Sequence, residues 1–243
     1  MQSTLIKFMV LVGMTVITSC GNQPKTITVG ASSTPHAIIL EQTKDYISSK
    51  GYTLNIKVFN DYVLPNYALE NGELDANYFQ HEPYLNEFNS ANGTHLVSVK
   101  KVHFEPMGIY CGKKSTLEEY AHGDVIIVPS DKSNYDRAMN LLAAHGITNA
   151  NIAPVEAQMI PMMLTDCDFG VINGNYALSS NIVDKCIVTE DKTSEIAQKM
   201  ANIIAVKDGN QESEKTKVLI EALSQDKIKQ YIHATFGSSV IAM

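Results

Sequence analysis

The residues best suited to binding chemistry stand together between Asp75 and Phe88, in the run DANYFQHEPYLNEF. Asn77 and His81 offer hydrogen-bonding groups, and Phe79 and Tyr84 offer aromatic faces. Taken alone, Phe79 is typical of a core and Tyr84 of surface packing. Polar groups within a buried wall need partners, however. Their combination just after a predicted strand therefore indicates one wall of a ligand pocket.

Histidines near acids raise two further possibilities, a hydrolase and a metal receptor. His36, His81 and His103 each have an acidic residue close in sequence. No HExxH, GxSxG or P-loop pattern accompanies them. A zinc or manganese receptor would need about three or four converging His, Asp or Glu ligands. We therefore expect no catalytic residue, no metal site and no cofactor.

The N-terminus has the composition of an export signal. Lys7 precedes an apolar run from Phe8 to Ile17, which rises only about 15 Å as a helix and is too short to span a bilayer. Small residues follow, as at a cleavage site. The residues Ile17 to Cys20 resemble the bacterial lipoprotein box, which predicts a signal peptide over residues 1–19, acylation of Cys20 and a tether over 20–24. The alternative is an ordinary secretory signal that leaves a free thiol.

Charge and cysteine content exclude several other classes. The chain has a formal charge of −7, and the leader contributes one Lys and no acid, so the mature part is more negative still. Nucleic acid is therefore not an expected partner. Cys111, Cys167 and Cys186 are too few and scattered for a disulfide scaffold or a CxxC metal site. A bridge between Cys167 and Cys186 remains open.

Hydrophobic periodicity predicts an α/β protein with two lobes, separated by two crossings of the chain. Residues 25–105 with 200–243 are expected to form lobe 1, and residues 106–199 lobe 2. Such a chain makes a hinged cleft, a common ligand site. The expected strands are Lys25–Gly30, Thr53–Phe59, Leu74–Phe79, two extended runs in Leu96–Cys111, Asp124–Val128, Phe169–Asn173 and Ala201–Val206. The expected helices are Pro35–Lys50, Pro65–Asn71, Glu82–Ala91, Ser133–His145, Met159–Thr165, Glu212–Leu223 and Asp226–Phe236. For the first three strands and the helices between them, a parallel sheet is expected.

Several stretches occur in an order that resembles a known family. They are VGASSTPHAIILE, FNDYVLPNYALENGELDANYFQHEPYL, HFEPMGIY, NYDRAMNLL, VINGNYAL and ANIIAVKDG. The chain resembles methionine-binding lipoproteins of the MetQ/NlpA type. The resemblance implies a type II periplasmic-binding-protein fold and a receptor, lipid-anchored on the extracytoplasmic face of a bacterial membrane. Such a receptor delivers L-methionine to an ABC importer, whose permease and ATPase would be its partners.

The same resemblance assigns roles to individual residues. Arg137, the chain's sole arginine, stands where the family has its carboxylate-binding arginine. A guanidinium meets a carboxylate with two charge-assisted hydrogen bonds. The alternative is a surface arginine paired with Asp136 or a nearby acid. Tyr62, Phe79, His81 and Tyr84 match positions that line the family's methionine pocket, and Asn173 matches an asparagine that hydrogen-bonds the ligand's polar end. Asn77 is a further expected ligand contact because it stands in the same wall.

The principal acceptor of the ligand's ammonium group remains open at this point. Tyr78 and Glu105 are lesser candidates, and Asn175 is expected to shape a turn. Aromatic walls suit a thioether, since sulfur–aromatic contacts contribute about 0.3–1.5 kcal/mol each.

Two departures from the family bear on the ligand. The region between Gly146 and Glu156 is shorter than in typical members, and Met159 and Met162 replace the usual Gln and Arg around Pro161. Alternative ligands are D-methionine, a methionine derivative or a short methionine-containing peptide. A surface lipoprotein that keeps the fold without transport is a further alternative.

Overall fold

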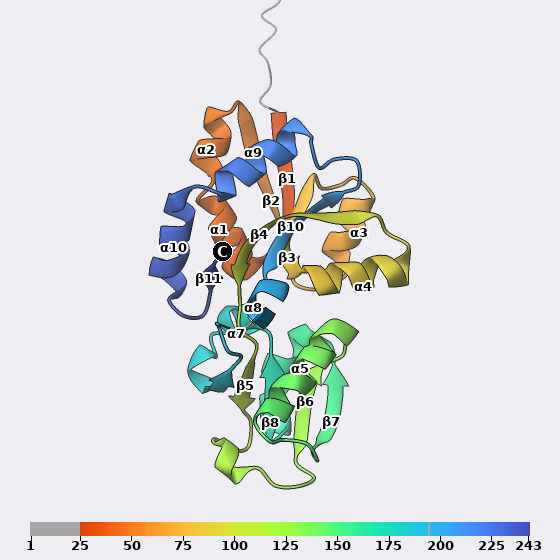
Figure 1. The fold of residues 1–243 in the computed structure, drawn as a ribbon, viewed down its shortest axis with the longest axis vertical. Helices are drawn as coiled ribbons and strands as arrows, with labels where there is room; N and C mark the ends of the chain where they lie inside the picture. Colours follow the sequence, from red (N-terminus) through yellow and green to blue (C-terminus); the bar gives the residue numbers. More distant parts are fainter. Residues whose placement is uncertain (1–24, 194) are drawn as a thin grey trace, which may run out of the picture.

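The computed structural model describes residues 25–193 and 195–243, which form two lobes, each built around its own β-sheet (Figure 1). The predicted signal peptide, the tether and Cys20 lie outside the described residues. Within these ranges, none of the helices combines the length and apolar character needed to cross a membrane.

The first lobe contains a six-stranded sheet in the order β11-β4-β10-β3-β1-β2. Its strands are β1 (Lys25–Ser32), β2 (Tyr52–Phe59), β3 (Ala76–His81), β4 (Leu96–Phe104), β10 (Asn202–Lys207) and β11 (Ile241–Ala242). β1 pairs in parallel with β2 and β3, which confirms the parallel arrangement expected for this unit. β10 runs antiparallel to both β3 and β4, so the whole sheet is mixed.

Helices cover both faces of this sheet. They are η1 (Ser33–Ala37), α1 (Ile38–Glu41), α2 (Lys44–Ser49), α3 (Leu64–Glu70), α4 (Glu82–Asn92), α9 (Glu214–Leu223) and α10 (Asp226–Phe236). Alternation along β10 serves both faces, because Ile204 packs with the residues under α1, α2, α9 and α10, while Ile203 packs with those under α3 and α4.

The single helix predicted over Pro35–Lys50 is wrong. The structure has three shorter segments there, with residues 42 and 43 between α1 and α2. The Thr43 hydroxyl donates to the Leu40 carbonyl at 2.6 Å, a local bond that competes with a continuous helix.

The second lobe contains a five-stranded sheet in the order β7-β6-β8-β5-β9. Its strands are β5 (Gly108–Cys111), β6 (Val125–Pro129), β7 (Asn151–Val155), β8 (Phe169–Ile172) and β9 (Cys186–Thr189). The helices are η2 (Leu117–Glu119), α5 (Lys132–Ala144), η3 (Ala157–Met159), α6 (Ile160–Met163), η4 (Leu164–Asp166), α7 (Gly174–Ser179), η5 (Val183–Lys185) and α8 (Glu195–Lys199). β7, β9, α7, α8 and the short helices η2 and η5 have no counterpart among the predicted elements. Cys111, Cys167 and Cys186 are free, so Cys167 and Cys186 are not bridged.

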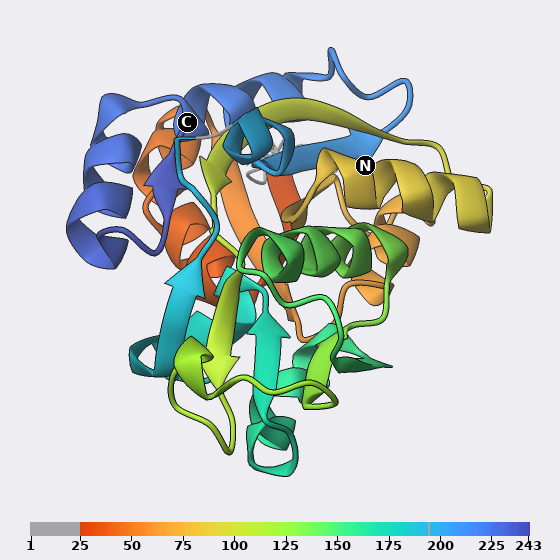
Figure 2. The same ribbon diagram turned by 60° about the horizontal axis from the view of Figure 1, so that its bottom comes forward.

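The chain passes between the sheets twice, from β4 into β5 and from β9 into β10 (Figure 1). We propose to place the lobe boundaries at these two connections, close to residues 105 and 200. The lobes also touch away from the connections, where α4 lies beside α5 (Figure 2). There the Glu87 carboxylate accepts the backbone N–H of Ser133 at 2.8 Å and that of Lys132 at 3.2 Å, at the start of α5. The lobes are therefore closed upon each other.

Candidate ligand-binding cleft

A cavity lies where the two lobes meet. Lobe 1 and the first connection contribute Tyr62, Phe79, Gln80, His81, Tyr84, Glu105 and Asn202 to its lining; lobe 2 contributes Asn134, Arg137, Asn173, Gly174 and Asn175. All the predicted site residues except Asn77 are among them. The lining combines aromatic rings, amides and two charged groups, which suits a small ligand with one apolar and one polar end.

The aromatic wall is built from both lobes around Tyr62. Its ring centroid lies 5.7 Å from those of Phe79 and Tyr84 in lobe 1 and 4.9 Å from that of Tyr176 in lobe 2. The Tyr62 hydroxyl donates to Asn175 Oδ1 at 2.6 Å across the cleft, and the Tyr84 hydroxyl donates to the Tyr62 carbonyl at 3.1 Å. Asn175 thus joins the lobes, in addition to its expected place in the turn after Gly174.

His81 is the N-cap of α4, where its Nδ1 accepts the Tyr84 backbone N–H at 3.2 Å. Nε2 must then carry the proton, which it donates to Asn134 Oδ1 at 3.1 Å. Burial, followed by the positive charge of Arg137, lowers the pKa of His81 to about 3. The imidazole is therefore a neutral hydrogen-bond donor at neutral pH.

Asn173 shares the Asn134 acceptor, because its Nδ2 donates to Asn134 Oδ1 at 2.8 Å. Asn173 Oδ1 is buried and has no hydrogen-bond partner among the described residues. An unpaired acceptor in a cavity wall costs free energy unless a bound donor satisfies it. This oxygen is thus suited to accept a hydrogen bond from a ligand.

Arg137 is almost fully buried, with 5% of its side chain exposed, and it pairs with Glu190. Its Nε donates to Glu190 Oε1 at 2.7 Å and its Nη2 to Glu190 Oε2 at 2.5 Å; Nη2 also donates to the Glu105 carbonyl at 2.8 Å. The alternative of a surface arginine is wrong, because Arg137 is buried. Arg137 does pair with an acid, but that acid is Glu190, whereas Asp136 pairs with Lys132.

One edge of the guanidinium is thus fixed by Glu190, which also accepts the Met107 backbone N–H at 2.8 Å. Within the described part of the chain, the guanidinium donates its hydrogen bonds from Nε and Nη2, and Nη1 remains available to a ligand. Because Arg137 lines the cavity, this remaining edge can receive an anionic group.

Asn77 lies apart from the cavity lining. Its Nδ2 donates to Asn66 Oδ1 at 2.8 Å and to the Pro65 carbonyl at 3.2 Å, and its Oδ1 accepts from Gln80 at 3.0 Å. This buried amide network ties α3 to β3. We therefore leave Asn77 out of the proposed ligand contacts.

Sequence reasoning missed Asn202, at the start of β10, as a site residue. Its Oδ1 accepts from His36 Nε2 at 2.9 Å, and the residue lines the cavity. A signal was present, since Asn202 borders a buried strand at the second lobe crossing, much as Asn173 follows one in lobe 2. Asn134, in the first turn of α5, was also missed.

Comparisons with known proteins agree with this architecture. The model of the family described as NlpA lipoprotein matches residues 27–151 and 147–243. The methionine-binding lipoprotein MetQ of Bacillus subtilis (strain 168) is 32% identical, over 99% of this chain and 98% of that protein.

Solved structures are similar as well. A lipoprotein from Ruminococcus gnavus ATCC 29149 is 43% identical, with a TM-score of 0.88 over 90% of this chain and 99% of that one. A nutrient binding protein from Burkholderia cenocepacia, bound to methionine, is 31% identical, with a TM-score of 0.82 over 89% of this chain and 99% of that one.

The chain shares its two-lobed fold with solved substrate-binding proteins, among them a periplasmic substrate-binding protein of an ABC transporter from Coxiella burnetii, which is 30% identical with a TM-score of 0.83 over 89% of this chain and 100% of that one. The chain belongs to the NlpA lipoprotein family.

Proposed function

We propose that this protein is a receptor whose lobes close on L-methionine and deliver it to the permease and ATPase of an ABC importer. The observation that carries the proposal is the arrangement of complementary groups around one cavity. The aromatic side chains of Tyr62, Phe79 and Tyr84 line the same cavity as Arg137, with its remaining Nη1, and Asn173, with its unpaired oxygen.

Each part of methionine then has a matching surface. The thioether side chain packs against the aromatic rings, which are polarizable partners for sulfur. The carboxylate accepts hydrogen bonds from Arg137, and the ammonium group donates to Asn173 Oδ1. His81 positions this end of the site, because its proton goes to Asn134, which also holds Asn173.

Relatives support this ligand class. The nutrient binding protein from Burkholderia cenocepacia is bound to methionine, and the relative from Salmonella typhi is described as a D-methionine-binding lipoprotein. Both enantiomers therefore belong in the test.

The test is a thermal melt of the purified protein after unfolding and refolding to remove carried-over ligand. L-methionine at about 100 times its dissociation constant should stabilise the fold by about 2.7 kcal/mol, a shift of roughly 5–10 °C for this size. A larger shift with D-methionine would make D-methionine, and not L-methionine, the proposed ligand. No shift with either enantiomer, in a sample that melts cooperatively, would contradict methionine binding.

We further propose that Cys20 carries the lipid anchor and that the lobes face the extracytoplasmic side. The leader composition and the family's lipoprotein description support this proposal. Mass spectrometry of the mature N-terminus tests it, and an unmodified Cys20 thiol in membrane-extracted protein would contradict it.

A further inference from the structure

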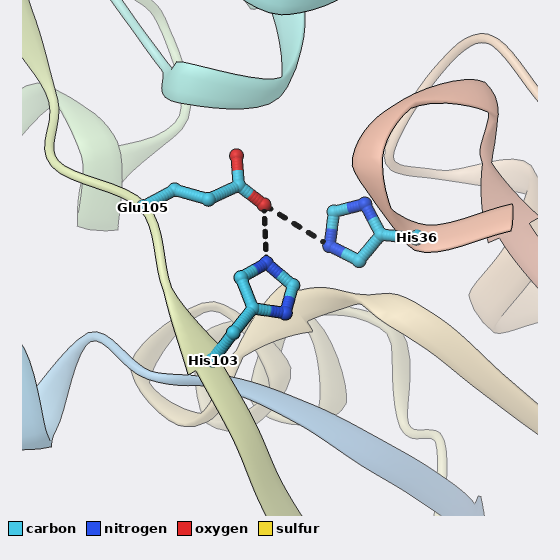
Figure 3. A group of neighbouring side chains, drawn as sticks. All are labelled: His36, His103 and Glu105. Atoms are coloured by element: carbon cyan, nitrogen blue, oxygen red, sulfur yellow. Dashed lines mark hydrogen bonds and ion pairs between the residues drawn. The ribbon is translucent and has the colours of Figure 1, made fainter. Parts of the chain in front are cut away.

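Three titratable side chains gather in the interior beside the ligand cavity: His36, His103 and Glu105 (Figure 3). His103 Nε2 lies 2.7 Å from Glu105 Oε1, and His36 Nε2 lies 3.3 Å from the same oxygen. Glu105 also lines the cavity, and 5% of it is exposed. The cluster thus joins the core of lobe 1 to the ligand site.

The neighbours of each ring fix the positions of the protons. The Tyr78 hydroxyl lies in hydrogen-bond contact with His103 Nδ1 and has no other partner among the described residues, so Nδ1 accepts. The His103 proton is then on Nε2 and points at Glu105. His36 Nε2 faces two acceptors, Glu105 Oε1 and Asn202 Oδ1, so it also carries a proton. The 2.7 Å contact is then a hydrogen bond that His103 Nε2 donates to Glu105 Oε1.

Both imidazoles are neutral donors. Burial lowers the pKa of His36 to about 4 and that of His103 to about 3. Burial raises the pKa of Glu105, while His36, Arg137 and the Asn175 backbone N–H act against that rise. Burial prevails, so the pKa of Glu105 stays raised, and these groups from both lobes only limit the rise.

This carboxylate has hydrogen bonds but no cation of its own. The nearby guanidinium of Arg137 touches the Glu105 backbone carbonyl, and its charge is matched by Glu190 through two bonds. Within residues 25–193 and 195–243, the basic side chains within ion-pair distance of the Glu105 carboxylate are His36 and His103, and both are neutral. A buried carboxylate of this kind is strongly stabilised by a cation that enters the cavity.

Gly174, which directly follows Asn173, lies against the side chain of Glu105. A Cβ added at Gly174 would lie 2.9 Å from Glu105 Cβ and 3.1 Å from Glu105 Oε2, so a glycine is needed for this approach. Asn173, with its unpaired Oδ1, and Glu105 thus line the same cavity, and both side chains can accept hydrogen bonds.

We propose that Glu105, together with Asn173 Oδ1, receives the protonated α-amino group of the ligand, and that His36 and His103 are positioning residues that aim the Glu105 carboxylate. The inference rests on the proposed function and narrows its substrate class. The site selects amino acids with a free α-amino group and rejects analogues in which that group is missing or acylated.

The experiment compares the dissociation constants of L-methionine and des-amino methionine by calorimetric titration of the refolded protein. In des-amino methionine, hydrogen replaces the amino group. The parent should bind methionine at least about 10-fold more tightly, since a hydrogen bond to a charged group contributes about 1.5–3 kcal/mol. Glu105→Gln should weaken the binding of methionine by about 10- to 100-fold and change the binding of des-amino methionine little. The preference for methionine over des-amino methionine should therefore shrink.

Two further sets of variants separate this role from a general structural one. Glu156→Gln removes an exposed carboxylate from the outer mouth of the cleft and should leave the preference unchanged. His36→Gln and His103→Gln should lower the preference for methionine over des-amino methionine. A merely structural role would weaken both ligands alike.

The outcomes are distinct. A parent that binds both ligands equally well overturns this inference and leaves the methionine receptor standing, whereas a parent that binds neither overturns both. If Glu105→Gln does not melt cooperatively, Glu105→Asp is used, which withdraws the charge from the cavity by one methylene and should lose part of the preference. An unchanged preference in every folded Glu105 variant also overturns the inference.

Discussion

Arg137→Gln should destabilise the protein through the partner that it leaves behind. Glu190 is 7% exposed and would lose both of its bonds to the guanidinium. Removing one partner of a buried pair costs about 3–5 kcal/mol, because the remaining charge is uncompensated. For a chain of this size, about 2–4 °C accompany each kcal/mol, so the melting temperature should fall by roughly 6–20 °C.

The double variant Arg137→Gln/Glu190→Gln should recover most of this loss, since it buries no lone charge and the oxygen of the introduced amide can still accept the Met107 N–H. Binding should not recover with stability. Titration should show methionine binding at least about 100-fold weaker in both variants, because the carboxylate loses its charged donor. Lys132→Gln, which breaks an exposed pair with Asp136, is the control and should cost about 1 kcal/mol or less.

Two results would refute this reasoning. A double variant that melts no higher than Arg137→Gln would show that the lone carboxylate is not the source of the loss. Methionine affinity that survives in Arg137→Gln would remove Arg137 from the carboxylate site.

Two further predictions concern stability and the pocket wall. His36, His81 and His103 have pKa values lowered to about 3–4 in the fold, against 6.5 when exposed, so their neutral forms contribute full stability above about pH 6.5. That stability should decline as pH falls toward 4, by up to about 1.4 kcal/mol per pH unit for each ring. The Glu105 carboxyl partly offsets this decline, because burial raises its pKa and its protonation then favours the folded state as pH falls. Melts across this range that give a flat profile would contradict the burial of neutral rings. Asn77→Ala should cost about 1–3 kcal/mol of stability with little change in methionine affinity, whereas Phe79→Ala should weaken binding by about 1–3 kcal/mol. Melts and titrations of the two variants check the contrast, and equal losses of affinity would contradict it.

The sequence was most informative where one strand carries several neighbouring groups of the site. The period of a strand predicts Asn77, Phe79 and His81 on one face of β3. In the structure the pairing with β10 shifts register between Tyr78 and Gln80, and the Gln80 amide donates to Asn77 Oδ1, so strict alternation does not hold along the strand. The period of a strand does not tell how far each residue lies from the ligand cavity. Ligand crevices border the carboxyl ends of strands in α/β sheets, and Asn77 lies two residues, or about 6.6 Å, further from that end than Phe79 does. It is therefore covered by α3, where its amide pairs with Asn66.

The partner of Arg137 was beyond sequence reasoning for a different reason. Glu190 lies 53 positions away and directly follows β9, a strand of four residues that was not predicted. A short edge strand carries too few residues for a clear alternation. The cluster of His36, His103 and Glu105 likewise depends on β1, β3 and β4 lying in one sheet, since no spacing in the sequence brings His36 to the other two.

The two departures from the family fall outside the cavity, and this bears on the choice of ligand. Met159 and Met162 are 42% and 69% exposed and are absent from the cavity lining. The shortened region contains β7, which is an edge strand of the second sheet and is separated by β6 from β8, the strand that leads to Asn173. A change at that edge leaves the aromatic wall, Arg137 and Asn173 in place. The departures therefore leave the residues of the cavity lining in place, while Glu156, Ala157 and Gln158 beside them line the mouth of the cleft together with Tyr62 and Tyr84.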